Sequence, residues 1–334
     1  VIKREREGGY LGKTIQVIPH VVDEIKERIY AATEDNDFLI IELGGTVGDI
    51  EGLPFMEAIR SIRHELPKTN TMNIHLSLVP YIKAAGELKT KPTQHSVQEL
   101  RRIGITPHML VCRTERELPK ALKDKLALAC DIDRNAVIEA GDAQSIYQVP
   151  LQFIKEGILT PLSEHFNIKI KPNMEKWDTL VKNILLPQGE VTIAFVGKYL
   201  DLKESYKSLI EALIHAGAHL STKVNIHWCD SERIEDVGAY DIIGNSDAIL
   251  VAGGFGQRGV NGKLAAIKYA RENKIPYLGI CLGMQLAIIE FAKNVLGLED
   301  ANSIEFDADT KNPLIYLIDE FMDQSGNKQI RTHE

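Results

Sequence analysis

The chain has 334 residues, and at roughly 150 residues per domain this length predicts two domains, each able to bury its own core. Hydrophobic residues make up 44% and charged residues 26%, and no stretch approaches the roughly 20 uninterrupted apolar residues of a membrane-spanning helix, which excludes that class of protein. The 39 Lys and Arg against 47 Asp and Glu leave a formal charge of -8, which argues against a general nucleic-acid binder but permits local basic pockets for polyanionic ligands.

The cysteines and the N-terminus indicate where the protein works. Cys112, Cys130, Cys229 and Cys281 are widely spaced and match no structural metal pattern, so a reducing, cytoplasmic location fits best. The first residues, Val-Ile-Lys-Arg-Glu-Arg-Glu, have neither an initiator Met nor a signal peptide. We therefore expect the sequence to be part of a longer chain.

Short apolar runs and helix-period segments alternate along the chain. The predicted strands are residues 38–43, 74–79, 108–112, 191–196, 248–251 and 277–280. The predicted helices are residues 21–31, 96–103, 121–129, 206–215 and 263–272. This alternation predicts an α/β fold class with two doubly wound, mostly parallel sheets.

The domains are predicted to meet in a linker. Residues 169–189 carry Lys171-Pro172-Asn173, a short amphipathic stretch and Pro187 before a new strand begins. We therefore assign residues 1–168 to the first domain and residues 190–334 to the second.

In the first domain, a loop that follows the strand at 38–43 combines glycines with carboxylates. Residues 42–51 contain three glycines together with Glu42, Asp49 and Glu51. A carboxylate at the carboxyl end of a parallel strand suits Mg²⁺, and glycines let phosphates approach the backbone. The alternative is a solvated acidic loop with no ligand.

A second loop in this domain is basic. Lys89 and Lys91 stand beside Thr93 and Gln94 just before a predicted helix, whose N-terminus favours phosphate. An exposed basic loop is the alternative, but the rigid Pro92 favours a binding role.

In the second domain, a glycine-rich loop follows the strand at 248–251. The sequence Val251-Ala-Gly-Gly-Phe-Gly256 lets backbone N–H groups come close to a substrate, as an oxyanion hole requires. Glycine loops alone are weak evidence for any one function.

A strand that runs directly into a helix carries the strongest signal. Cys281 stands at the joint, with Gly279 and Gly283 two residues to either side. Small flanking residues suit the tight, strained turn of a nucleophile elbow, and the helix N-terminus behind the sulfur stabilises a thiolate. A lone cysteine after a strand is more often a buried apolar residue, but the flanking glycines reverse that preference.

Loop and elbow together resemble the class I, triad-type glutamine amidotransferases. The resemblance implies that Cys281 attacks the side-chain amide of glutamine and that Gly254 and Leu282 offer oxyanion N–H groups. It also implies that the glutamine site is formed by Gly254, Phe255, Leu282, Gly283, Met284, Gln285 and Glu305.

The family's triad also needs a His and an acidic residue far downstream of the cysteine. The sequence reaches only His333-Glu334, 53 residues after Cys281, and we interpret that pair as coincidental. The 334-residue chain alone is therefore expected to hydrolyse little glutamine.

The first domain, with Tyr10-Leu-Gly-Lys-Thr-Ile-Gln-Val-Ile-Pro-His20, resembles the P-loop-type synthetase domain of the CTP synthase family, and the likeness spans nearly the whole chain. It implies a ligase that phosphorylates O4 of UTP with ATP and displaces the phosphate with ammonia from glutamine. The resemblance also implies Mg²⁺, GTP as an activator, CTP as a feedback inhibitor, and homotetramers or filaments.

The resemblance assigns roles residue by residue. Glu42 would ligate the metal, His20 and Gln16 would lie near the reacting centre, and Arg258 would be near GTP. UTP and CTP would contact Asp49, Ile50, Glu51, Lys89, Thr90, Lys91, Pro92, Thr93, Gln94 and Lys125, and ATP would contact Gly141, Asp142 and Ala143.

Two departures from the family pattern are expected to matter. The family's P-loop lies upstream of Val1, so ATP binding by these 334 residues should be incomplete. Ala252 stands where the family has proline, which loosens one backbone angle and leaves the oxyanion donors in place. Two alternatives stay open: a simple cysteine hydrolase on a flavodoxin-like fold, and a nucleotide-binding filament or regulatory scaffold without activity.

Overall fold

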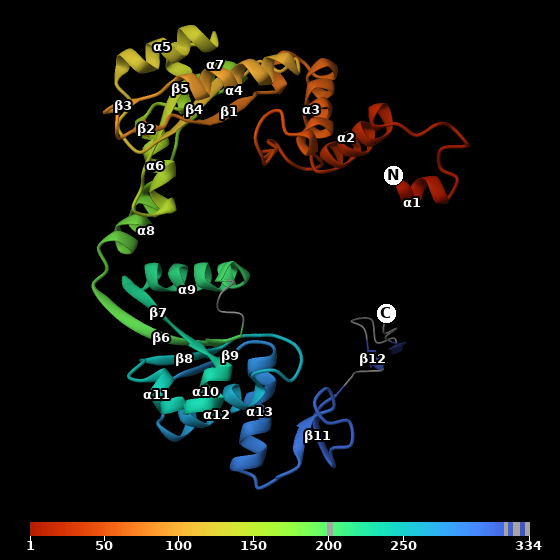
Figure 1. Cartoon of the computed structure of the whole chain (residues 1–334), viewed down its shortest axis with the longest axis vertical. Helices are drawn as coiled ribbons and strands as arrows, with labels where there is room; N and C mark the ends of the chain where they lie inside the picture. The colour runs from red at the N-terminus through yellow and green to blue at the C-terminus, as the bar shows by residue number, and fades with distance from the viewer. Residues whose placement is uncertain (199–202, 317–319, 323–327, 331–334) are drawn as a thin grey trace. The chain divides into compact units, whose positions relative to one another are not determined.

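The computed structural model describes residues 1–198, 203–316, 320–322 and 328–330, and divides into two compact units, Val1–Asp178 and Thr179–Glu334 (Figure 1). The division falls inside helix α8, Glu175–Leu185. The domain limits 1–168 and 190–334 stay predictions. No helix among the described residues is long and apolar enough to cross a membrane.

A parallel three-stranded sheet forms the centre of the first unit. Its order is β1 (Ile74–Leu78), β4 (Met109–Thr114) and β5 (Val137–Gly141). Helices α4 (Lys91–Arg102) and α5 (Lys120–Cys130) cover one face, where they enclose Val97, Leu110 and Leu126. The other elements are α1 (Ile2–Arg6), α2 (Val22–Ala31), α3 (Leu53–Glu65), β2 (Tyr81–Ile82), β3 (Glu87–Leu88), α6 (Val149–Lys155) and α7 (Leu159–Phe166).

A parallel four-stranded sheet, in the order β7-β6-β8-β9, forms the centre of the second unit. Its strands are β6 (Gly189–Gly197), β7 (Thr222–Asp230), β8 (Ala248–Val251) and β9 (Tyr277–Gly279). The helices are α9 (Lys207–His219), α10 (Ser231–Val237), α11 (Ala239–Ile243), α12 (Val260–Glu272) and α13 (Leu282–Asn294). Short pairs join β10 (Ala301–Ser303) to β11 (Asn312–Ile315), and β12 (Glu320–Met322) to β13 (Lys328–Ile330).

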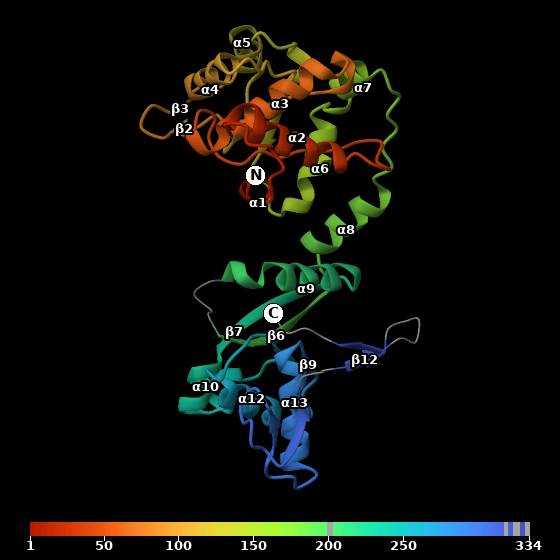
Figure 2. The same cartoon turned by 90° about the vertical axis from the view of Figure 1, so that its right-hand side faces the viewer.

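Both faces of this second sheet are covered. Successive residues of β6 point to opposite faces, as the period of a strand requires. Ala194 and Val196 pack with α10 to α13, whereas Phe195 packs with α9 (Figure 2). The predicted α/β fold class with parallel sheets is confirmed in both units.

One predicted strand is wrong. Residues 38–43 form no strand, and Phe38 and Ile40 are 59% and 95% exposed. An apolar run becomes a strand only when a neighbour pairs with its backbone groups, and among the described residues β1 pairs with β4 alone. Strand β7, by contrast, was not predicted, although Val224, Ile226 and Trp228 alternate with polar residues.

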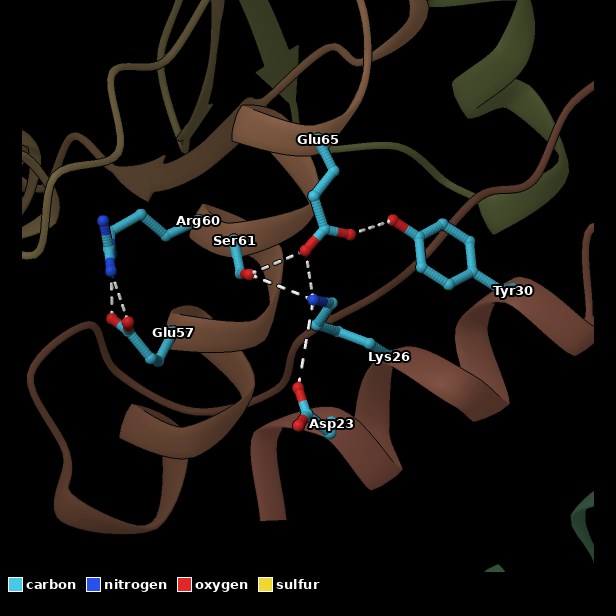
Figure 3. A network of polar contacts seen from close by, with 7 residues as sticks. All are labelled: Asp23, Lys26, Tyr30, Glu57, Arg60, Ser61 and Glu65. Carbon is cyan, nitrogen blue, oxygen red and sulfur yellow. Dashed lines mark hydrogen bonds and ion pairs between the residues drawn. The ribbon is translucent and has the colours of Figure 1, made fainter. Parts of the chain in front are cut away.

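A network of polar side chains joins α2 to α3 (Figure 3). Lys26 pairs with Glu65 and donates to the Ser61 hydroxyl at 3.2 Å, and the Tyr30 hydroxyl donates to Glu65 at 2.7 Å. Burial, together with the hydrogen bond to Glu65 and its negative charge, raises the pKa of Tyr30 to about 12. The folded state therefore holds the Tyr30 proton more tightly than the unfolded chain does.

The Tyr30→Phe variant is expected to test this network. It should lower the free energy of unfolding by about 0.5–1.5 kcal/mol near pH 8, because one hydrogen bond to a carboxylate is lost. Since the folded pKa lies above the ordinary value of 10.0, the difference from wild type should be full below pH 10 and shrink as pH rises towards 12.

Urea unfolding of both proteins at several pH values measures this difference. The control is Tyr81→Phe, in the same unit, because the Tyr81 hydroxyl has no carboxylate partner among the described residues. A Tyr30 effect that is equally large at pH 8 and pH 11.5 would contradict the prediction.

Candidate active site

Cys281 lies at a strained joint between β9 and α13. Its φ of 52° and ψ of −110° are rare for a residue with a side chain, and helix α13 begins at the next residue. A Cβ on Gly279 would lie 2.6 Å from the carbonyl carbon of Gly283, and one on Gly283 would lie 2.2 Å from the carbonyl oxygen of Val251. Only glycine fits at both positions, so the spacing noticed in the sequence has a steric cause.

The Cys281 side chain is exposed, whereas the three other cysteines, Cys112, Cys130 and Cys229, are buried. Burial raises the pKa of the Cys112 and Cys229 thiols to about 12, which makes them inert. The interpretation of Cys281 as a core cysteine is therefore excluded. Its sulfur is the accessible thiol of the described chain.

The glycine loop that follows β8 lies against the thiol. A Cβ built on Gly253 would be 3.3 Å from Cβ and 3.9 Å from Sγ of Cys281. The loop is held in the sheet because Ala252 donates to Val196 at 3.0 Å and Val251 accepts from Ile280 at 3.0 Å. Strand connectivity thus brings the two sequence motifs together.

The two predicted oxyanion donors flank this contact. Leu282 begins α13, where the first N–H groups of a helix have no partner inside the helix. Within the part of the chain that the structure describes, neither the Gly254 N–H nor the Leu282 N–H donates a hydrogen bond. Free N–H groups beside a nucleophile suit a developing negative charge. Their role as an oxyanion hole stays a prediction.

The predicted glutamine residues lie around the same loop. Glu305 accepts a hydrogen bond from the Gly256 N–H at 2.9 Å, which fixes its carboxylate on the loop. Phe255 and Met284 are exposed, and Gln285 is half-buried in the first turns of α13. The structure thus brings these residues near one another, but their contact with glutamine is not tested.

The general base of a triad is not found among the described residues, because no histidine among them forms a hydrogen bond or ion pair with Cys281. His333 and Glu334 lie outside the described residues.

Two buried lysines lie near Cys281 and were not predicted as site residues. Lys263 is fully buried in the first turn of α12, and Lys198 is 4% exposed after β6. Burial and, to a smaller extent, the positive charge of Lys198 lower the pKa of Lys263, whereas the Cys281 sulfur acts in the opposite direction; together they bring this pKa to about 8. The sequence held a signal, because Lys263 stands three residues after Val260 and four before Ile267, on the apolar face of the helix.

In the first unit, the basic loop and α5 come together. The Lys89 ammonium pairs with Glu87, and the pKa of Glu87 is lowered by Lys89 and, to a smaller extent, by Lys125. Lys91 is the first residue of α4, with Pro92 next to it, an arrangement typical of a helix start. The binding of a nucleotide by Lys89, Lys91 and Lys125 stays a prediction.

Three other predicted nucleotide residues are turned inward. The hydroxyl of Thr93 is buried and donates to the Leu78 carbonyl at 3.1 Å, and buried Gln94 donates to the buried Thr90 hydroxyl at 3.1 Å. Their side chains hold the loop on the helix. Their part in UTP binding stays a prediction.

The remaining nucleotide candidates lie in loops. Gly141 ends β5, and Asp142 next to it pairs with Arg113 at 2.5 Å, so they lie at the carboxyl edge of the sheet, where ligands of α/β folds bind. Ala143 follows in the same loop. In the acidic loop, the Thr46 N–H donates to Asp49 at 3.2 Å, and Ile50 and Glu51 lie in the short turn before α3.

The metal candidate is Glu42. No cluster of three or more metal-ligating side chains occurs among the described residues. A single carboxylate nevertheless fits Mg²⁺, which commonly takes one or two carboxylates and completes its shell with water and substrate phosphates. Of the more loosely assigned residues, Gln16 donates its backbone N–H to His20 at 3.1 Å, and Arg258 pairs with Glu232.

Comparisons with known proteins give a consistent family picture. A family model described as "CTP synthase N-terminus" matches residues 1–168, and one described as "Glutamine amidotransferase class-I" matches residues 201–332. Curated relatives called CTP synthase include those of Nautilia profundicola and Wolinella succinogenes, both 67% identical over 100% of this chain, and one of Campylobacter jejuni, 66% identical over 99%. The matches cover 62%, 60% and 61% of those proteins, so this chain spans about three fifths of their length.

One solved structure is similar to part of the chain. It is the glutaminase domain of Trypanosoma brucei CTPS with bound acivicin, 43% identical, with a TM-score of 0.37, and the match covers 39% of this chain and 50% of that one.

Proposed function

Because the chain belongs to the CTP synthase family, we propose that the protein of which it is part makes CTP from UTP, ATP and glutamine. The single observation that carries this proposal is the exposed Cys281 at a strained strand-to-helix joint, with a glycine loop against its side chain. A cysteine in this geometry can act as a nucleophile. The match of residues 1–168 to the model of the CTP synthase N-terminus supports a synthetase domain that would consume the released ammonia.

The proposed first reaction is glutamine hydrolysis. The Cys281 thiolate attacks the side-chain amide carbon, and the C=O electron pair moves onto oxygen, where the N–H groups of Gly254 and Leu282 stabilise it. Collapse of this intermediate breaks the C–N bond and releases ammonia once a proton reaches the nitrogen. Water then cleaves the thioester to give glutamate and the free thiol.

The proposed second reaction takes place in the first unit. ATP transfers its γ-phosphoryl group to O4 of UTP, which turns a poor leaving group into a good one. Ammonia then attacks C4, and phosphate leaves with the C–O electron pair. Mg²⁺ bound at Glu42 would neutralise phosphate charge, and Lys89, Lys91 and Lys125 would hold the nucleotide.

The further parts of the proposal concern regulation and assembly. GTP would activate the glutaminase, CTP would inhibit by occupying the pyrimidine site, and the protein would form homotetramers or filaments in the cytoplasm. The scaffold alternative has no observation of its own. The simple-hydrolase alternative conflicts with the synthetase match over residues 1–168.

The test uses this sequence within a polypeptide of the length of its relatives. CTP formation is followed with UTP, ATP and Mg²⁺, first with ammonium chloride and then with glutamine. We expect both nitrogen sources to support synthesis. Glutamine hydrolysis without any CTP formation would favour the simple hydrolase, and binding of UTP without either reaction would favour the scaffold.

A further inference from the structure

Two buried ammonium groups hold the backbone of the glycine loop. The Lys263 Nζ donates to the carbonyl oxygen of Ala252 at 3.1 Å, and the Lys198 Nζ donates to that of Phe255. These carbonyls stand at the two ends of the Gly253-Gly254 pair. The lysines come from different elements, α12 and the end of β6, so the loop is held from two directions.

Holding a carbonyl also directs the next N–H. In a trans peptide the C=O and the following N–H point in opposite directions, and the described residues contain a cis bond only at Ile18-Pro19. The Phe255–Gly256 peptide shows this: its carbonyl faces Lys198, and its N–H reaches Glu305 at 2.9 Å. By the same rule, the N–H of Gly253 points away from Lys263. The predicted oxyanion donor, the N–H of Gly254, belongs to the next peptide, which lies between the two held carbonyls.

The lysines and the thiol lie against neighbouring residues of the loop. A Cβ on Gly254 would be 3.6 Å from Lys263 Nζ and 3.3 Å from Lys198 Cε, whereas a Cβ on Gly253 would be 3.3 Å from the Cys281 Cβ. The two lysine side chains therefore lie against Gly254, next to the residue that contacts the nucleophile. Positive charges near a thiol favour its thiolate, and they also favour a nearby oxyanion.

A purely structural role explains this arrangement poorly. Burying one ammonium is costly, and a second like charge beside it adds repulsion, so an apolar side chain of similar length would fill the space with less strain on the fold. The lowered pKa of Lys263, caused first by burial and then by Lys198, reports that unfavourable setting. An arrangement that opposes stability next to a reactive group is typical of a functional site.

We propose that Lys263, supported by Lys198, is a positioning residue for the Cys281 nucleophile: it fixes the carbonyl of Ala252 so that the loop presents its N–H groups, and its charge favours the thiolate. This inference rests on the proposed glutaminase site. It adds a residue on α12 to a site otherwise built from the glycine loop and the elbow.

The test is alkylation of Cys281 in the 334-residue chain by iodoacetamide, followed by peptide mass spectrometry between pH 6 and 9.5. The reaction is selective because the three other cysteines are buried. In the Lys263→Met variant we expect the alkylation rate at pH 7 to fall about threefold to tenfold. The pH at which this rate reaches half of its limiting value should rise by about 0.5 to 1. The charged groups that act on Lys263 in this range are Lys198 and Cys281.

The matched control is Lys268→Met, five residues further along α12, where an exposed ammonium pairs with Glu272. Its alkylation profile is expected to match wild type. If Lys263→Met is folded by circular dichroism and its profile also matches wild type, the proposal is wrong, even if its thermal unfolding temperature changes. If Lys263→Met does not fold, Lys198→Met decides in the same way, with a slower reaction at pH 7 supporting the proposal and an unchanged profile overturning it.

A failure of the role of Lys263 can be distinguished from a failure of the proposed function. Alkylation needs no glutamine, so unchanged profiles would overturn the role of Lys263 and leave glutamine hydrolysis by the longer protein untouched. A longer protein that fails to hydrolyse glutamine would overturn the proposed function while leaving a difference in alkylation intact.

Discussion

Replacing Cys281 by alanine is expected to lower glutamine-dependent CTP formation by at least about 1,000-fold, because no other group can form the thioester. Ammonia-dependent formation should stay close to wild type, since added ammonia bypasses the thiol. The measurement is the ratio of the two rates in a polypeptide of the relatives' length. A change in this ratio is informative because general damage to the fold would lower both rates together.

Cys229→Ala is the matched control for this experiment. Cys229 belongs to the same unit but is buried in the core beneath the sheet, away from solvent. Its removal should leave the ratio unchanged, even if the protein becomes less stable. Glutamine-dependent synthesis that survives Cys281→Ala would show that another group attacks the amide, and the proposed site would have to be abandoned.

Gly283→Ala is expected to lower the free energy of unfolding of the second unit by about 3 kcal/mol, through overpacking and backbone displacement. The added methyl group would lie 2.2 Å from the Val251 carbonyl oxygen, which already accepts the Ile280 N–H. Relief requires α13 to move away from β8, and that movement would carry Cys281 away from the glycine loop.

Urea unfolding and the Cys281 alkylation rate measure these two effects. Gly189→Ala is the control, because a Cβ there meets nothing within 4 Å, and its expected change is within about 0.5 kcal/mol. Equal stability losses in both variants, or none in Gly283→Ala, would show that the close approach of α13 to β8 does not constrain the elbow.

The elbow was predictable from sequence because its geometry requires particular residues at fixed positions in one short segment. A backbone that passes within contact distance of another backbone admits only glycine, so the spacing of Gly279, Cys281 and Gly283 encodes the turn directly. The glycine loop is encoded in the same way. The spacing does not predict the direction of the thiol, because that direction depends on packing against β8.

Other features depend on partners far away in the sequence, and there the prediction failed or was incomplete. Residues 38–43 have strand composition, but no described strand pairs with them. The sequence did not show that the Thr93 hydroxyl donates to the Leu78 carbonyl, and the part of Thr93 in nucleotide binding stays a prediction. A lysine in a helix is usually solvated, so the sequence did not predict a buried Lys263, and only the tertiary fold shows that its side chain is enclosed.

The backbone strain at Cys281 also bears on how such a chain would change over generations. A φ of 52° with a ψ of −110° costs about 1–3 kcal/mol for any residue with a side chain, and glycine would relieve most of it. Selection for robustness and selection for reactivity therefore act in opposite directions at one codon. Replacing this cysteine by glycine would gain stability and lose the thiol, so the strain at position 281 is a cost that only a use of the thiol would offset.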